Sequence, residues 1–261
     1  METSPMTSAQ KIRIWSLRLA LGLAVFLPIY FASAALGSKF GIWDWRFGFK
    51  LMRSYGPNLL YISAFMSVMS LILAFVIKPR NGQGLSVFAL TVPFLFMAYG
   101  QSVKMRAQSV PPIHDISTDT QDPPVFSSTI IDLRGTTSNS LNYVGKKVGK
   151  SDKIVSVEQV KAYPDIRTIE SQLSPSESFK KALETVTGMG WKEQSRSEST
   201  GVIEATDTTS WFGFKDDVVI RIRPSEAGGS LVDIRSVSRV GMSDVGANAA
   251  RIRKFTDKFN N

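Results

Sequence analysis

The segment 113–124 combines the residue types from which a metal site can be built. It reads Ile-His-Asp-Ile-Ser-Thr-Asp-Thr-Gln-Asp-Pro-Pro and contains His114, Asp115, Asp119 and Asp122. Three carboxylates and one imidazole suit Ca²⁺, Mn²⁺ or Mg²⁺ better than Zn²⁺. The spacing lacks the Asp-x-Asp-x-Asp-Gly run of a calcium loop, and Asp before Ser, Thr or Pro is ordinary turn chemistry. We therefore favour acids that accept backbone N–H bonds, expect no cofactor, and keep a metal site as the alternative.

His114 is the only histidine in the chain and a candidate general base, with a neighbouring acid to orient it. The sequence holds no Gly-x-Ser-x-Gly elbow, no phosphate-binding loop and no His-Glu-x-x-His motif. A lone histidine in a proline-rich stretch is more often hydrogen-bonded and structural. We therefore assign no catalytic residue, and a metal-assisted or His-assisted hydrolase at a membrane surface remains the alternative function.

Four arginines form the second candidate site. Arg221 and Arg223 share one side of a predicted strand, and Arg235 and Arg239 share one side of the next. Arginine forks bind carboxylate or phosphate through two parallel hydrogen bonds, and Trp211 would supply an apolar wall. These residues would suit an acidic lipid or another amphiphile. The competing interpretation, which we favour, is a solvated strand face with cross-strand Arg–Asp and Arg–Glu pairs.

The distribution of charge indicates a membrane rather than nucleic acid. The 261 residues carry a net charge of +9, but residues 1–106 hold 11 Lys and Arg against two acids. Residues 107–261 hold 20 basic and 20 acidic side chains. Lys and Arg that flank apolar spans meet anionic headgroups, whereas a nucleic-acid domain carries its own basic excess. We therefore expect the lipid bilayer as a partner and no nucleic acid.

The absence of cysteine excludes disulfides and zinc–thiolate sites.

Three apolar runs predict about three transmembrane helices near the N-terminus. The runs cover residues 19–36, 59–77 and 85–103. Each approaches the roughly 20 residues that cross about 30 Å of hydrocarbon. We therefore predict a transmembrane anchor over residues 1–106 and a soluble domain over residues 107–261.

The first apolar run has two interpretations that lead to the same topology. It is either a span or a cleaved signal peptide, because Lys11, Arg13 and Arg18 precede it and Ala32-Ser-Ala resembles a cleavage site. With the N-terminus inside, three spans place the soluble domain outside, and cleavage leaves two spans with the same result. Basic residues divide five against six between the two sides, so the expectation of a periplasmic domain rests on the first helix.

The soluble half predicts an α+β fold. Ser174, Pro175 and Glu177 form a capping box at the start of a helix that Gly188 and Gly190 end. Strands are expected over residues 191–196, 202–208, 218–223 and 231–239, with a further short strand over 153–157. A second main helix is expected over residues 244–259 with Ser243 as its cap. This order indicates an antiparallel sheet covered by two main helices on one face, preceded by an extended 113–124 segment.

Several motifs in the soluble half resemble one family. They are Ile113-His-Asp-Ile-Ser-Thr-Asp, Asp122-Pro-Pro, Tyr163-Pro-Asp-Ile, Met189-Gly-Trp, Phe214-Lys-Asp-Asp-Val-Val-Ile-Arg-Ile-Arg and Val232-Asp-Ile-Arg-Ser-Val-Ser-Arg-Val-Gly-Met-Ser-Asp-Val-Gly-Ala-Asn-Ala. In this order they resemble the domain of unknown function 1499, and the resemblance implies an envelope-associated bacterial protein without implying any activity. We therefore expect a protein of the bacterial inner membrane with a periplasmic domain. That domain would be a non-catalytic binding or accessory module for an amphiphile or an envelope protein.

Overall fold

The computed structural model describes residues 5–261 and divides them into two compact units. The first comprises the helices up to Met105 together with Ser210–Gly213, and the second comprises Arg106–Thr209 and Phe214–Asn261. The strands of the sheet all lie in the second unit. The connection Ser210–Gly213, between two of these strands, groups with the first unit.

The first unit is built from apolar helices. They are α1 (Ser8–Lys39), α2 (Trp45–Lys50), the π-helical turn η1 (Leu51–Tyr55), α3 (Gly56–Val76) and α4 (Gln83–Ser109). Three stretches, Ser8–Lys39, Trp45–Val76 and Gln83–Ser109, are long and apolar enough to cross a membrane. This confirms the three predicted apolar helices, which indicate a membrane anchor.

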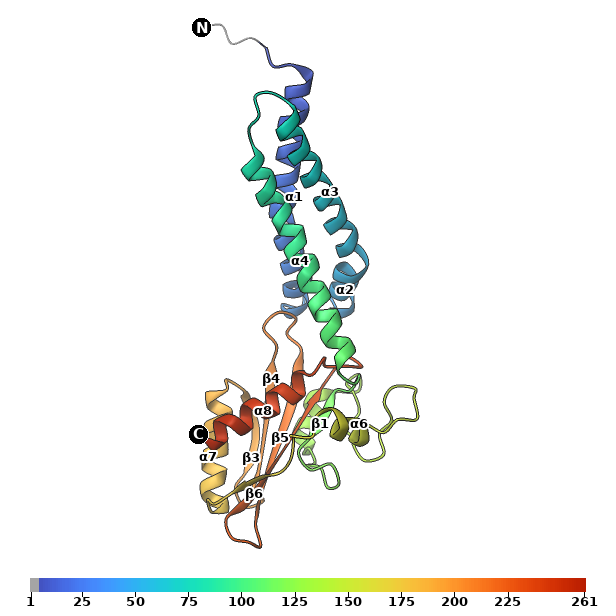
Figure 1. Cartoon of the computed structure of the whole chain (residues 1–261). Helices are drawn as coiled ribbons and strands as arrows, with labels where there is room; N and C mark the ends of the chain where they lie inside the picture. Colours follow the sequence, from blue (N-terminus) through green and yellow to red (C-terminus); the bar gives the residue numbers. More distant parts are fainter. Residues whose placement is uncertain (1–4) are drawn as a thin grey trace. The chain divides into compact units, whose positions relative to one another are not determined.

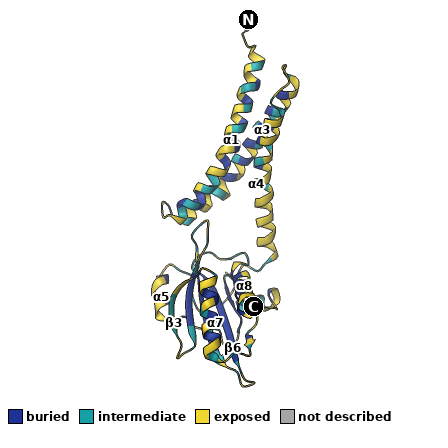
Figure 2. Cartoon of the chain, turned by 90° about the vertical axis from the view of Figure 1, so that its left-hand side faces the viewer, coloured by how far each residue is buried: buried dark blue, intermediate teal, exposed yellow. Residues whose placement is uncertain are grey.

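Small residues lie where these helices contact one another. Ala20, Ala24 and Ala89 form one buried cluster, and Ser70 and Ser86 share a hydrogen bond of 2.8 Å between their hydroxyl oxygens. Small side chains let membrane helices approach closely. Most of the larger apolar side chains face outward, so the helices are largely exposed in Figure 2, as a lipid environment allows.

The second unit is built around one antiparallel sheet. Figure 1 shows this sheet, whose strands run in the order β1-β6-β5-β4-β3. The short strand β2 also pairs with β6. The bounds are β1 (Asp115–Ser117), β2 (Ile169–Ser171), β3 (Lys192–Ser197), β4 (Val202–Thr208), β5 (Lys215–Pro224) and β6 (Ser230–Ser238). The four long strands were predicted. The two three-residue strands were not, because they are too short to show an alternating pattern.

Four helices complete the second unit: α5 (Ser128–Arg134), α6 (Val155–Ala162), α7 (Pro175–Gly188) and α8 (Ala247–Asn260). The capping box at Ser174 and Glu177 is present as predicted. The strand expected over residues 153–157 is wrong, because Val155 begins α6 and only Ile154 makes an isolated bridge, to Lys147. The buried residues of α6 are Val155 and Gln159, and their spacing of four residues is that of a helix.

The last helix begins three residues later than predicted. Gly246 precedes it with a φ of +83°, a left-handed conformation that glycine adopts without strain. The carboxylate of Asp244 accepts hydrogen bonds from the backbone N–H groups of Gly246 and Asn248, at 2.7 and 2.9 Å. Ser243 therefore belongs to a turn before the helix, and Asp244 takes the capping role that we expected for Ser243.

Different parts of the chain cover the two faces of the sheet. Val218, Ile220 and Ile222 join the apolar core beneath α7 and α8, and Figure 1 shows α8 lying across this side of the strands. Val219 points to the other face and packs with Phe126 and Ile130 of the α5 region. The alternation was predicted correctly. The expectation of one solvated face was wrong, because α5 and the chain before it bury much of the second face.

Candidate functional site

The second face holds a buried ion pair between the two predicted sets of site residues. Arg235 Nε and Nη2 donate to Asp115 Oδ1 and Oδ2, both at 2.9 Å. The guanidinium carbon lies 5.4 Å from the ring centre of Phe126 and 5.3 Å from that of Tyr143. Further Arg235 donors reach the carbonyl oxygens of Pro124 and Leu141 at 3.1 and 2.6 Å. The charge of Arg235 is therefore compensated by Asp115.

Arg239 is also engaged in a buried ion pair. Its guanidinium donates to both carboxylate oxygens of Asp217, at 2.9 and 2.8 Å. Arg134 of α5 donates to the same carboxylate at 2.7 Å. Burial lowers the pKa of Arg134, an effect that the hydrogen bond and charge of Asp217 oppose. Arg239 also donates to the carbonyl oxygen of Leu133 in α5 at 2.8 Å, so it ties α5 to the sheet, and it lines neither pocket of this unit.

Arg221 and Arg223 form a third cluster with three carboxylates. Both donate to Asp233, at 2.9 and 2.7 Å. Arg221 also donates to Asp122 at 2.9 Å, and Asp119 lies 3.4 and 3.5 Å from the two arginines. Two arginines thus face three aspartates, which leaves one negative charge. An acidic headgroup gains little attraction at such a cluster.

The acids of segment 113–124 are occupied by arginines and by the backbone. Asp119 Oδ1 accepts the backbone N–H bonds of Gln121 and Asp122, at 3.0 and 2.9 Å, as we expected for turn chemistry. Within residues 5–261, no group of three His, Cys, Asp or Glu side chains is gathered as a metal ion would require. A metal at His114, Asp115, Asp119 and Asp122 stays a prediction that this geometry does not favour.

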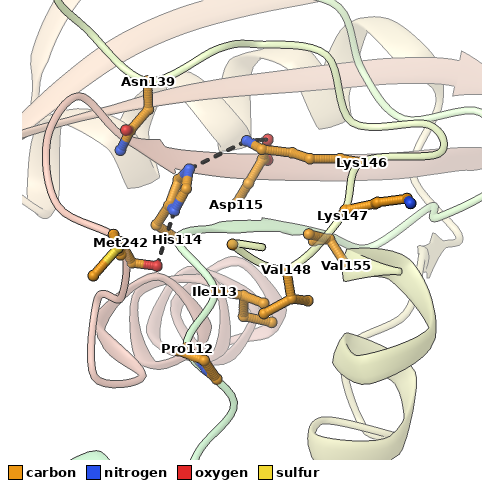
Figure 3. Close-up of a pocket in the computed structure, with 11 residues that line it drawn as sticks. Pro112, Ile113, His114, Asp115, Asn139, Lys146, Lys147, Val148, Val155 and Met242 are labelled. Carbon is orange, nitrogen blue, oxygen red and sulfur yellow. Dashed lines mark hydrogen bonds and ion pairs between the residues drawn. The ribbon is translucent and has the colours of Figure 1, made fainter. Parts of the chain in front are cut away.

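His114 instead lines a small pocket with Lys146 (Figure 3). The pocket has a volume of about 80 Å³. His114 Nδ1 lies 3.2 Å from the carbonyl oxygen of Met242, and its Nε2 lies 3.2 Å from Lys146 Nζ. A carbonyl only accepts, so Nδ1 carries the proton and Nε2 accepts from the lysine. Burial, and then the charge of Lys146, lower the pKa of His114.

Lys146 is held on one side of this pocket by three acceptors. Its ammonium lies 3.0 Å from the carbonyl oxygen of Ser140 and 3.5 Å from Asp115 Oδ2, besides the contact with His114. Burial lowers the pKa of Lys146, and the charge of Asp115 opposes that shift. Perturbed ionisable groups that meet in a cavity are typical of functional sites.

Arg235 of the Asp115–Arg235 ion pair lines a larger apolar cleft. Its volume is about 410 Å³, and Arg235 is the one charged residue in its lining. Its lining residues are Pro123, Val125, Phe126, Ile131, Leu141, Asn142, Tyr143, Val144 and Arg235. Ile131 is 53% exposed and Val144 72% exposed, so apolar surface remains open to solvent. Clefts of this size, with apolar walls and few polar groups, are typical of small-molecule sites.

The structure separates the predicted site residues. Arg235 lines the cleft, and His114 and Asp115 line the small pocket. Trp211 lies in the connection between β4 and β5, is 60% exposed and lines neither.

The sequence did not reveal Phe126, Tyr143 or Lys146. The chain around them has no helical or strand period, and their partners lie far away in the sequence. Composition gave no signal either, because Phe126 and Tyr143 are the two aromatic residues between positions 123 and 144.

The comparisons with known proteins concern the unit that contains both pockets. A search of curated proteins found no match. The family model described as "Protein of unknown function (DUF1499)" matches residues 115–259, which include all six strands. The resemblance drawn from the motifs is thereby confirmed. Because the match covers more than half of the 261 residues, the chain belongs to the DUF1499 family of proteins of unknown function.

Proposed function

We propose that this protein is a membrane-anchored binding module whose second unit holds an amphiphile in the cleft beside Arg235. The cleft itself carries the proposal. Its volume of about 410 Å³ lies within the 300–1,000 Å³ or so that ligand pockets occupy. Its one charged lining residue is already neutralised by Asp115, so an uncharged apolar portion of a ligand gains most from entering.

The exposed cleft residues support an apolar ligand. Val144 and Ile131 are more than half exposed, although burying such a side chain stabilises a protein by about 1.5–3 kcal/mol. Exposed apolar surface gathered at a concave site marks an interaction surface more often than a solvated one.

The short link to the membrane helices favours a lipid-derived ligand over an apolar peptide. Helix α4 ends at Ser109, and β1 begins at Asp115. The intervening residues are too few to carry the domain far from a bilayer, because extended chain spans at most about 3.6 Å per residue. Amphiphiles of the bilayer are then the apolar molecules at highest local concentration. The polar group that orients the ligand in the cleft would be Asn142 or an edge of Arg235.

The setting of this module is also part of the proposal. Three apolar helices and the absence of cysteine support a bacterial inner-membrane protein with a periplasmic domain. An alkaline phosphatase fused after Asn261 would be active with a periplasmic C-terminus. An inactive but stable fusion would place the domain in the cytoplasm.

Lipid retention tests the binding function. Full-length protein is purified in mild detergent, and its bound lipid is measured by native mass spectrometry and by extraction. Ile131→Asp and Val144→Asp place a carboxylate in the cleft at positions that are already exposed, so folding should persist. We expect at least one lipid fewer per chain in both variants, because an unpaired charge is costly against an acyl chain.

A matched control comes from helix α6. Val157 is 48% exposed and lies outside the cleft, so Val157→Asp adds the same charge elsewhere. The control should retain as much lipid as the wild type, which also corrects for lipid bound to the apolar helices. Equal lipid in all four proteins would refute an amphiphile in the cleft. Loss of a co-purifying protein in the two cleft variants alone would point to an envelope protein as the ligand.

A further inference from the structure

The small pocket at His114 places a lysine where its positive charge is poorly compensated. Asp115 is the nearby carboxylate, and both its oxygens already accept from Arg235 at 2.9 Å. Lys146 Nζ reaches the same carboxylate only at 3.5 Å. Its side chain is 15% exposed, so water compensates little of the charge. Arg235 and Arg134 add positive potential and lower the pKa of Lys146 further, after burial. A desolvated lysine near other cations is the arrangement that activates an amine as a nucleophile.

The same pocket supplies an acceptor for the lysine proton. His114 Nε2 lies 3.2 Å from Lys146 Nζ, within reach for direct proton transfer. The bond between Nδ1 and the Met242 carbonyl holds the ring in the tautomer that leaves Nε2 unprotonated. Figure 3 shows His114 between the Met242 carbonyl and Lys146, with Asp115 on the far side of the amine.

We propose that Lys146 is a reactive amine that forms an imine with a small aldehyde or ketone in this pocket. Lys146 gives a proton to His114 Nε2, and its nitrogen lone pair attacks the carbonyl carbon. A proton then moves from the attached nitrogen to the alkoxide oxygen, which gives the carbinolamine. Its hydroxyl takes the proton back from His114 and leaves as water as the nitrogen lone pair forms the C=N bond. Overall, an ammonium and a carbonyl compound give an iminium and water, so no oxidant, reductant or metal is required.

The shape of the pocket restricts the carbonyl compound. Its volume of about 80 Å³ is well below the cavity of about 150 Å³ that holds a benzene molecule, so the ligand has only a few non-hydrogen atoms. Apolar walls from Ile113, Val148 and Val155 suit a short alkyl chain. The lining shares Asp115 with the ion pair behind the cleft but no residue with the cleft, so this site does not depend on the proposed lipid function.

Reductive trapping tests the proposal directly. Folded full-length protein is incubated at pH 7 with propionaldehyde and cyanoborohydride, which converts an imine to a stable secondary amine. Peptide mass spectrometry then gives the initial rate at each lysine. We expect Lys146 to react severalfold faster than the exposed Lys180, because its lowered pKa leaves more of its amine neutral at pH 7 and His114 accepts its proton. A rate at Lys146 equal to or below that at Lys180 would overturn the proposal.

Two further measurements separate a reactive site from a merely accessible one. His114→Gln keeps a hydrogen-bonding side chain but removes the proton acceptor, so trapping at Lys146 should fall severalfold while Lys180 is unchanged. An unchanged rate at Lys146 in that variant would remove His114 from the proposal. Trapping in urea-unfolded wild-type protein should make the two lysines equal. A preference for Lys146 that survives unfolding would show that local sequence, not the pocket, is responsible.

Discussion

The two faces of the sheet are equally buried at their centres but are held in different ways. On one face, Ile220 and Ile234 pack against α7 and α8 in an apolar core. On the other face, Asp217, Asp233 and Arg235 are buried in ion pairs beneath α5 and segment 113–145. The comparison shows that strand alternation assigns each side chain to a face, but does not reveal what will cover that face.

The difference in chemistry sets how each face responds to change. Apolar burial has no preferred direction, so shape and volume decide its cost. A buried ion pair must recover a large desolvation penalty, which it does only with good geometry and further hydrogen bonds. We therefore expect the loss of one ion-pair partner on the ionic face to lower the free energy of unfolding more than a conservative change on the apolar face.

Removal of Arg235 should have the largest effect. Arg235→Ala leaves the fully buried Asp115 with only the more distant Lys146, which should cost about 3–5 kcal/mol of unfolding free energy. Denaturant unfolding of the second unit in the full-length protein measures this. The paired change Asp115→Leu with Arg235→Met should recover part of the loss, because no carboxylate is then left without its arginine, while Lys146 loses the weaker of its charge contacts. A single variant that loses under about 1 kcal/mol would contradict the contrast between the faces.

A conservative change on the apolar face should cost less. Ile220→Val removes one buried methylene and should lower the unfolding free energy by about 0.5–1.5 kcal/mol. The loss should be the same at low and high salt, since no charge is involved. A strongly salt-dependent loss would mean that the two faces are not energetically separate.

Much of this contrast could be predicted from the sequence, and its decisive part could not. The capping box at Ser174 and the hairpin of β5 and β6 follow from local spacing, so they were predicted correctly. Arg235 and Asp115 were both singled out, but as members of different sites. Their pairing joins residues 120 positions apart, which no local pattern reveals. Lys146 was missed for the same reason, because its contact partner His114 lies 32 residues away in the sequence.

Lowering the pH should reduce the free energy of unfolding of the second unit through His114, which directly precedes β1. The pKa of His114 is lowered in the folded protein, so folding favours the neutral ring. That contribution is complete above the unfolded pKa of about 6.5 and is lost as pH falls through the lower folded pKa. Wild-type protein should therefore lose more stability between pH 7 and pH 5 than His114→Gln. Identical losses would show that the neutral ring contributes nothing.

A change at Asp122, the most exposed carboxylate in the cluster with Arg221 and Arg223, should have the smallest effect on the free energy of unfolding. The side chain of Asp122 is 69% exposed, although it pairs with Arg221 at 2.9 Å. Asp122→Asn should change the unfolding free energy by no more than about 0.5 kcal/mol, because solvent screens the pair and Asp233 remains. A loss near that of Arg235→Ala would show that solvent exposure does not weaken this ion pair.

The central claim, that the cleft beside Arg235 holds an amphiphile, is tested most directly by photo-crosslinking. Full-length protein in bilayer vesicles is irradiated with a diazirine-labelled fatty acid, and the labelled peptides are identified. We expect label on the peptides that span residues 123–144, and we expect it to be reduced by excess unlabelled fatty acid and by Val144→Asp but not by Val157→Asp. Label confined to helices α1, α3 and α4 would contradict it.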